Sequence, residues 1–296
     1  MPQLPRRNVL EGVLAQSMHG VAGVVVHPDG SLSVDGDLGP GAAIDVGLHP
    51  DAHAGLVAFA DAAVALPRAP ARVKAQVTGP LTLGVALTRL GVAPSRAFPI
   101  AARVARESAV ALEAYFAQRL PDTALVLFFD EPALVAWRTD TPPLDRELAS
   151  DVLSAALASP RCVTGVHVCG AGDVQVALAA GPGILHLEVD AVSLDDAVAL
   201  SRFLDGGGWI AWGAVPTQGP IGEHPSPLWN ALLDVWCELT RRGCDPVRMR
   251  QQALVAPACG LAGHGPSQAE RAMSLARELG NRVHDQAAAT KLAIGA

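Results

Sequence analysis

The stretches VTGVHVC at 163–169 and GILHLEV at 183–189 decide the fold. Each is short, rich in Val, Ile and Leu, and of the length expected for one buried strand. Four more runs of this kind lie at 72–78, 123–130, 208–215 and 253–259. Between the runs the apolar residues follow a helical period, most clearly at 98–118 and 226–242. This alternation of strand and helix is typical of a parallel sheet covered by helices.

The number of these units favours a barrel. Six strand–helix units occur without a Gly-rich dinucleotide-binding fingerprint, so we expect a (β/α)8 TIM-type barrel, either complete or lacking its first βα unit, with residues 1–296 as a single domain. The first 70 residues differ, and VAGVVVHPDGSLSVDG at 21–36 predicts a hairpin with a Pro-Asp-Gly turn. Near the other end, Ser267 begins a capping-box pattern, and Gly280 is expected to stop the last helix.

Composition excludes several classes of partner. The 296 residues carry a formal net charge of −7 and no basic run, so we expect no nucleic-acid partner. Neither a signal peptide nor an uninterrupted apolar span of about 20 residues is present, which predicts a cytoplasmic protein that makes no membrane contact. The five cysteines are odd in number and irregularly spaced. Free thiols in a reducing compartment are therefore expected, with metal binding or catalysis favoured over disulfides.

Polar residues gather where the predicted strands end. Catalytic groups in (β/α) barrels cluster at the carboxyl ends of the strands. In this chain, those positions hold Thr78-Gly-Pro, Asp130-Glu131-Pro, His167-Val-Cys169, Glu188-Val-Asp and Cys259-Gly-Leu. The strand ends therefore predict the position of a functional site.

Four of these residues suggest a metal site. His167 and Cys169 point to one side of their strand, and by themselves they would be read as ordinary core residues. Glu188 lies on the polar side of the next strand, where a carboxylate needs a cation, and Cys259 ends the last strand. One nitrogen, two sulfur and one oxygen donor from three strands suit Zn²⁺ better than Mg²⁺ or Ca²⁺.

The same segments carry a family resemblance. From about residue 70 to 262 the chain resembles the catalytic, carboxyl-terminal barrel of cobalamin-independent methionine synthase, within the uroporphyrinogen-decarboxylase-like superfamily. The matching segments, in the family's order, are 74–80 (KAQVTGP), 129–134 (FDEPAL), 167–169 (HVC), 187–188 (LE) and 257–261 (PACGL).

The resemblance implies an activity and roles for individual residues. It implies that His167, Cys169, Glu188 and Cys259 bind zinc, and that the metal ionises the thiol of homocysteine, which then accepts a methyl group to give methionine. Asp130 would hold the substrate amino group, although by its position alone it fits a strand-end or cap carboxylate equally well. Glu131 either binds substrate or supports the turn.

Two departures from the family bear on substrates. The segment 212–217 (WGAVPT) lacks the His that the folate-using enzymes place after this strand, and no aromatic folate-binding segment is found. The donor implied is therefore a methylated corrinoid, such as methylcobalamin or a corrinoid protein, as in short "core" methionine synthases. The family's first βα unit, which contacts the substrate carboxylate, also has no match in this sequence, so we expect a misplaced start, an incomplete barrel or a substituting segment. Arg6 or Arg7 could take that role, but solvated surface is the simpler interpretation.

Three other functions remain open at this stage. One is methyl transfer to another thiol such as coenzyme M, against which Glu188 as a fourth ligand argues. Another is a lyase like uroporphyrinogen decarboxylase, although that enzyme's Arg-rich amino-terminal motif is missing. The third is a non-catalytic barrel that handles a corrinoid, for which the missing first unit is the best support.

Overall fold

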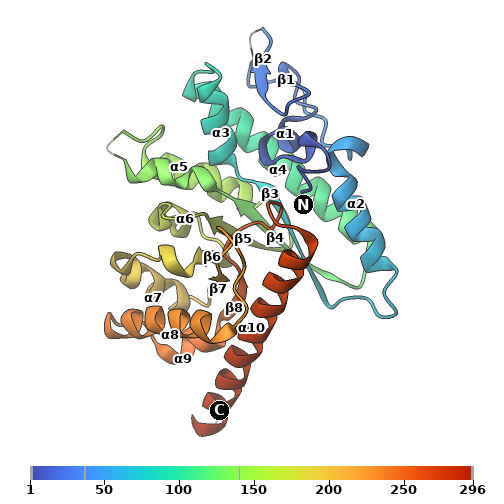
Figure 1. Ribbon diagram of the computed structural model, residues 1–296. Helices are drawn as coiled ribbons and strands as arrows, with labels where there is room; N and C mark the ends of the chain where they lie inside the picture. The colour runs from blue at the N-terminus through green and yellow to red at the C-terminus, as the bar shows by residue number, and fades with distance from the viewer. Residues whose placement is uncertain (1–2, 37, 140, 295–296) are drawn as a thin grey trace.

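The computed structural model describes residues 3–36, 38–139 and 141–294. Its centre is a parallel sheet with the strand order β3-β4-β5-β6-β7-β8. The sheet curls as it passes from β3 to β8 (Figure 1). Its strands are β3 (Arg72–Thr78), β4 (Ala124–Asp130), β5 (Val163–Val168), β6 (Ile184–Glu188), β7 (Trp209–Val215) and β8 (Ala253–Pro257). All six lie on the apolar runs of the sequence, which confirms the predicted α/β alternation.

Helices cover the convex face of the sheet, and the long α10 runs beside β8 (Figure 1). The α-helices are α1 (Val13–Met18), α2 (Pro50–Val64), α3 (Pro80–Arg89), α4 (Pro94–Arg119), α5 (Arg146–Leu157), α6 (Val174–Ala179), α7 (Ala197–Asp205), α8 (Pro225–Arg241), α9 (Pro246–Gln251) and α10 (Pro266–Ile294). Short 3-10 helices are η1 (Val9–Glu11), η2 (Pro132–Arg138), η3 (Val189–Ala191) and η4 (Leu194–Asp196). Within the described ranges, no helix is both long enough and apolar enough to cross a membrane.

Two predicted helices are confirmed, and one predicted helix end is wrong. The helices expected at 98–118 and 226–242 are α4 and α8. The last helix continues through Gly280, where we expected it to stop. Leu279 and Val283 on either side of Gly280 are buried at helical spacing, so core packing maintains the helix past a residue of weak helix propensity.

The two faces of the sheet have separate apolar clusters. The large cluster lies between the convex face and the helices. A small one, made of Phe128, Ile184 and Ala211 with Val126 packed against it, lies on the concave face. Alternation along each strand assigns residues to these faces. The floor of the concave face is therefore apolar on β4, β6 and β7, while β3 contributes Arg72, Lys74 and Gln76 beside it.

The barrel is less complete than expected. Among the described residues the parallel sheet has six strands and not eight, and β3 and β8 form its edges. Before β3 the chain forms η1, α1, α2 and a separate hairpin. In the hairpin, β1 (Val24–Val26) pairs antiparallel with β2 (Leu32–Val34) across the predicted Pro-Asp-Gly turn, so that prediction is confirmed. These strands are three residues long and bond to each other, so they add nothing to the sheet.

The amino-terminal segment contacts both edges of the sheet. At the end of β3, the Thr78 hydroxyl donates to the carbonyl of Val13 at 2.9 Å and accepts from the Ser17 hydroxyl at 2.8 Å. At the other edge, the Arg6 guanidinium donates to the carbonyl of Gly263, in the loop after β8. The segment therefore spans the carboxyl-terminal rim of the curled sheet, where the polar strand-end residues gather.

Candidate metal centre

His167, Cys169, Glu188 and Cys259 meet at the carboxyl end of the sheet. Each offers one donor atom, and these four atoms lie within 4.8 Å of one another. The sulfur atoms of Cys169 and Cys259 are 3.9 Å apart. His167 and Glu188 are buried, Cys169 is half-buried and Cys259 is exposed. The four residues that the sequence nominated from separate strands are thus brought together.

The parallel strands determine this convergence. His167 lies on β5 opposite His186 of β6, and Glu188 is the last residue of β6. Cys169 directly follows β5, and the chain then turns at Gly170, whose φ of 55° lies in the left-handed region that glycine adopts most readily. This turn directs the Gly170 amide to Glu188 Oε1 at 2.7 Å. One carboxylate oxygen of Glu188 is therefore held in place while the other remains available.

The geometry and chemistry of the set fit a zinc ion. Neither ring nitrogen of His167 has a hydrogen-bond partner within the described residues, although both are buried, and a metal would satisfy one of them. Zn–S bonds of about 2.3 Å in a tetrahedral site place two sulfur atoms about 3.8 Å apart. The measured 3.9 Å separation agrees with that value. All four donors are of the N, S and O types that bind zinc in proteins.

The two thiols also influence each other's ionisation. Contact with the Cys169 thiol, and then with the His167 ring, lowers the pKa of Cys259 to about 4. The same contact, with burial, raises the pKa of Cys169. The Cys259 thiol is therefore the more acidic of the two, and a bound cation would favour ionisation of both sulfur atoms.

Asp130 ends β4 beside the metal-ligand set. It lies opposite Thr78 of β3 on one side and opposite His167 of β5 on the other. The half-buried Asp130 carboxylate makes no hydrogen bond or ion pair with any described residue. Its negative charge is therefore available to a cationic group of a ligand at the strand ends.

Glu131 is placed differently from Asp130. It is fully buried, and its carboxylate receives the backbone N–H groups of Leu81 at 2.8 Å and Thr82 at 2.7 Å. The Thr82 hydroxyl adds a third hydrogen bond at 2.6 Å. These groups belong to the first turn of α3, whose N–H groups have no partner within the helix. Glu131 therefore joins β4 to that helix. Burial raises the pKa of Glu131 to about 7 against the effect of these bonds. The contacts match the turn-supporting role, and direct substrate binding by Glu131 stays a prediction.

Two residues on the concave face were not singled out as site residues. The His186 ring stacks on His167 with centroids 4.4 Å apart, and burial holds the pKa of His186 well below its usual value. Lys74 of β3 donates from Nζ to Gln76 Oε1 at 2.8 Å and stands over the Phe128 ring at 5.2 Å. The alternation of buried Val73, Ala75 and Val77 with polar neighbours on β3 was the signal that could have found Lys74.

The remaining cysteines lie away from these donors. Cys162, Cys237 and Cys244 are free, as are Cys169 and Cys259. The buried Cys244 donates its S–H to the carbonyl of Ala197 at 3.3 Å. This contact joins the loop between α8 and α9 to the start of α7.

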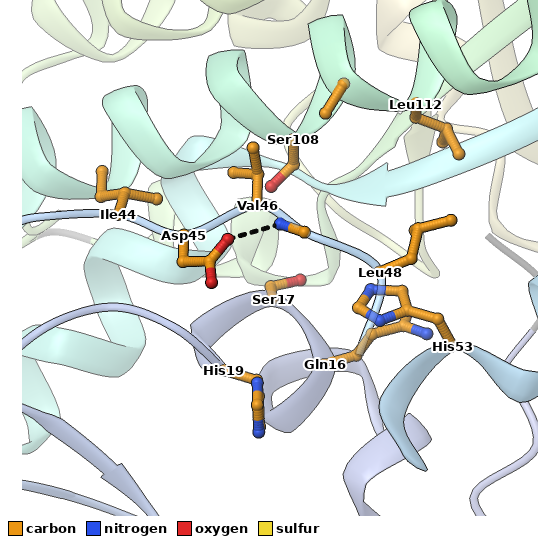
Figure 2. A pocket seen from close by; sticks show the side chains of 12 residues that line it. Gln16, Ser17, His19, Ile44, Asp45, Val46, Leu48, His53, Ser108 and Leu112 are labelled. Atoms are coloured by element: carbon orange, nitrogen blue, oxygen red, sulfur yellow. Dashed lines mark hydrogen bonds between the residues drawn. The ribbon is translucent and has the colours of Figure 1, made fainter. Parts of the chain in front are cut away.

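A small cavity beside α1 is a separate feature (Figure 2). Its volume is about 30 Å³, and its lining includes Gln16, His19, Asp45, His53 and Ser108. Figure 2 shows the Asp45 carboxylate turned back to the Gly47 amide, with which it forms a 2.8 Å hydrogen bond. Such a volume holds about one or two water molecules. The cavity is therefore too small for an amino acid, and we assign no substrate to it.

Comparison with known proteins supports the fold. No family model matches the sequence, and no curated protein matches it either. Among solved structures, the chain is similar to a B12-independent methionine synthase from Shewanella sp. W3-18-1, determined in complex with selenomethionine. The TM-score is 0.58 at 14% sequence identity, and the match covers 93% of this chain and 80% of that one. At this identity the likeness is one of fold, namely a helix-covered, curled parallel sheet of the partial TIM-barrel type.

Proposed function

We propose that this protein is a zinc-dependent methyltransferase that methylates the thiol of homocysteine to give methionine. The observation that carries the proposal is the convergence of four metal-donor atoms within 4.8 Å at the carboxyl end of a parallel sheet. Two of the donors are thiolate-forming residues, a set typical of zinc sites. Such sites activate thiols for attack on carbon electrophiles.

Asp130 is the feature that favours an amino acid as the thiol substrate. Its unpaired carboxylate lies beside His167 across the β4–β5 ladder. A substrate whose sulfur lies at the metal ligands would present its ammonium group to this carboxylate. A thiol without an amino group, such as coenzyme M, would leave Asp130 without a partner. We therefore prefer homocysteine to the other thiols.

The proposed chemistry needs one new bond. Zinc held by His167, Cys169, Glu188 and Cys259 would supply the Lewis acidity that ionises a thiol at neutral pH. The substrate sulfur then forms a bond to the methyl carbon while the bond from that carbon to the donor breaks, and the thiol proton passes to solvent. Asp130 orients the amino acid, and the Gly170 amide fixes the Glu188 carboxylate.

The structural neighbour supports the same reaction class. That protein is a methionine synthase, and the selenomethionine in its structure is the selenium analogue of methionine. We infer that this chain forms the same product on a related fold. Within that reaction class, the metal-ligand set and Asp130 are the residues that we assign to thiol activation and substrate binding.

For the methyl donor we propose a methylated corrinoid rather than a folate. The end of β7 and the two residues after it, Val215-Pro-Thr217, carry no His, so they supply no imidazole for protonating a departing folate nitrogen. A corrinoid leaves without needing a proton. Purified protein is to be assayed for methionine formation from homocysteine with methylcobalamin and, in parallel, with methyltetrahydrofolate. Turnover with the corrinoid alone is expected, and faster turnover with folate would contradict this choice of donor.

A further inference from the structure

We propose that Lys74 is the anion-binding residue that takes the carboxylate of the substrate amino acid. This inference rests on the proposed function and deepens it, because it assigns the group that selects an amino acid with a free carboxylate. No residue has yet been assigned to the substrate carboxylate, and Arg6 and Arg7 both have other partners. Arg6 bonds to the Gly263 carbonyl, and Arg7 pairs with Glu11.

Lys74 lies on the same face of the sheet as the metal-ligand set, further from the carboxyl ends of the strands. It lies on the concave face of β3, on the same side as Gln76 and Thr78. Its Nζ reaches Gln76 Oε1 at 2.8 Å, so the side chain points along the strand towards the carboxyl end. Phe128, over which the ammonium stands at 5.2 Å, is two residues before Asp130 on β4. The cation is thus directed to the strand ends where the metal-ligand set lies.

The Lys74 ammonium has no ion-pair partner among the described residues. An ammonium group has three N–H donors, and the described residues use one of them, for Gln76. No carboxylate among the described residues lies within ion-pair distance of Nζ. Lys74 as a whole is exposed, while its ammonium group is desolvated among the strands. Two donors are therefore free for an anionic ligand.

Lys74 also lies within electrostatic reach of both ends of the site. Desolvation among the strands lowers the pKa of its ammonium, while the charges of Asp130 and Cys259 oppose that change. If the substrate sulfur lies beside Cys259 and the substrate ammonium beside Asp130, the substrate carboxylate needs a cationic partner near both residues. Lys74 and Asp130 are unpaired charges of opposite sign on adjacent strands, complementary to the two charges of a zwitterion.

Ligand truncation separates this role from a general electrostatic effect. Calorimetric titration of the zinc-loaded protein would compare homocysteine, 4-mercaptobutanoate, which lacks the ammonium, and 3-aminopropanethiol, which lacks the carboxylate. In Lys74→Met we expect about tenfold to hundredfold weaker binding of the first two ligands and an unchanged affinity for 3-aminopropanethiol. Lys74→Arg keeps a cation and should retain most of the preference for the carboxylate-bearing ligands.

Arg72→Met is the matched control, since it removes one cation from the same face of β3, two residues further from the strand ends. It should bind all three ligands like wild type. Equal weakening of all three ligands in Lys74→Met, or none, would overturn the proposal, as would wild-type protein that binds homocysteine no better than 3-aminopropanethiol. Binding is measured without turnover, so normal ligand discrimination together with an absent methyl transfer would contradict the proposed function and leave the subsite standing.

Discussion

The sulfur atoms of Cys169 and Cys259 lie 3.9 Å apart although 90 residues separate them in the chain. The first follows β5 and the second follows β8, so the curl of the sheet across β6 and β7 is what brings them together. A flat sheet would keep strands three places apart at about 14 Å, since neighbouring strands are about 4.8 Å apart. The pair therefore reports on both the fold and the proposed metal site.

Metal content tests the ligand set. His167→Ala and Cys259→Ala each remove one of four donors and should lower bound zinc from about one equivalent to a small fraction, as measured by plasma mass spectrometry after dialysis. Cys237→Ala, an exposed cysteine of α8, is the matched control and should retain wild-type zinc. Full zinc retention in both ligand variants would remove these residues from the site.

Asp130 is expected to recognise the substrate ammonium. Asp130→Asn keeps the shape of the side chain and loses its charge, so the KM for homocysteine should rise about tenfold to a hundredfold. The zinc content should not change, because Asp130 is not among the four donors. Steady-state kinetics with homocysteine and with 4-mercaptobutanoate provides the check. An equal rise of KM for both thiols would mean that Asp130 does not contact the ammonium.

Glu131 should make stability depend on pH. Burial raises its pKa in the folded protein to about 7 from 4.5, so the folded state binds this proton more tightly than the unfolded state. The corresponding stability is fully present below pH 4.5 and is lost as pH rises through about 7, with a magnitude on the order of 3 kcal/mol. Urea unfolding at pH 5 and pH 8 should show this loss in wild type and a smaller one in Glu131→Gln. Identical pH dependence of the two proteins would contradict it.

The junction between β3, β4 and α3 leaves no space at Gly79. A Cβ added there would lie 2.3 Å from Glu131 Cδ, so Gly79→Ala must displace the buried carboxylate that caps α3. We expect a loss of about 1–3 kcal/mol in the free energy of unfolding. Gly222→Ala is the control, since a Cβ there meets nothing within 4 Å, and it should change stability by less than about 0.5 kcal/mol. Equal stabilities of the two variants would show that Glu131 moves freely.

The sequence was sufficient for the elements that depend on local pattern. The apolar runs predicted all six strands of the sheet, because a strand buried on both sides needs a continuous apolar stretch. The metal donors were predictable because the carboxyl ends of parallel strands meet on one side of the sheet. That chemical assignment and the single-domain interpretation of residues 1–296 stay predictions.

Features that depend on tertiary contacts could not be predicted from the sequence. The strand–helix pattern favoured a (β/α)8 barrel, complete or without its first βα unit, whereas the described sheet has six strands and the hairpin bonds only to itself. Gly280 was expected to end a helix whose continuation depends on the burial of Leu279 and Val283. Glu131 bonds to α3 about 50 residues before it in the chain, a contact that no local pattern indicates.

The most direct test of the central claim is the initial rate of methionine formation from homocysteine and methylcobalamin, with zinc content measured on the same samples. Zinc-loaded wild type should turn over, and Cys259→Ala should lose both its zinc and at least about a hundredfold of the rate, while Cys237→Ala keeps both. Wild type that carries a full equivalent of zinc and forms no methionine, or Cys259→Ala that retains the wild-type rate, would contradict the account.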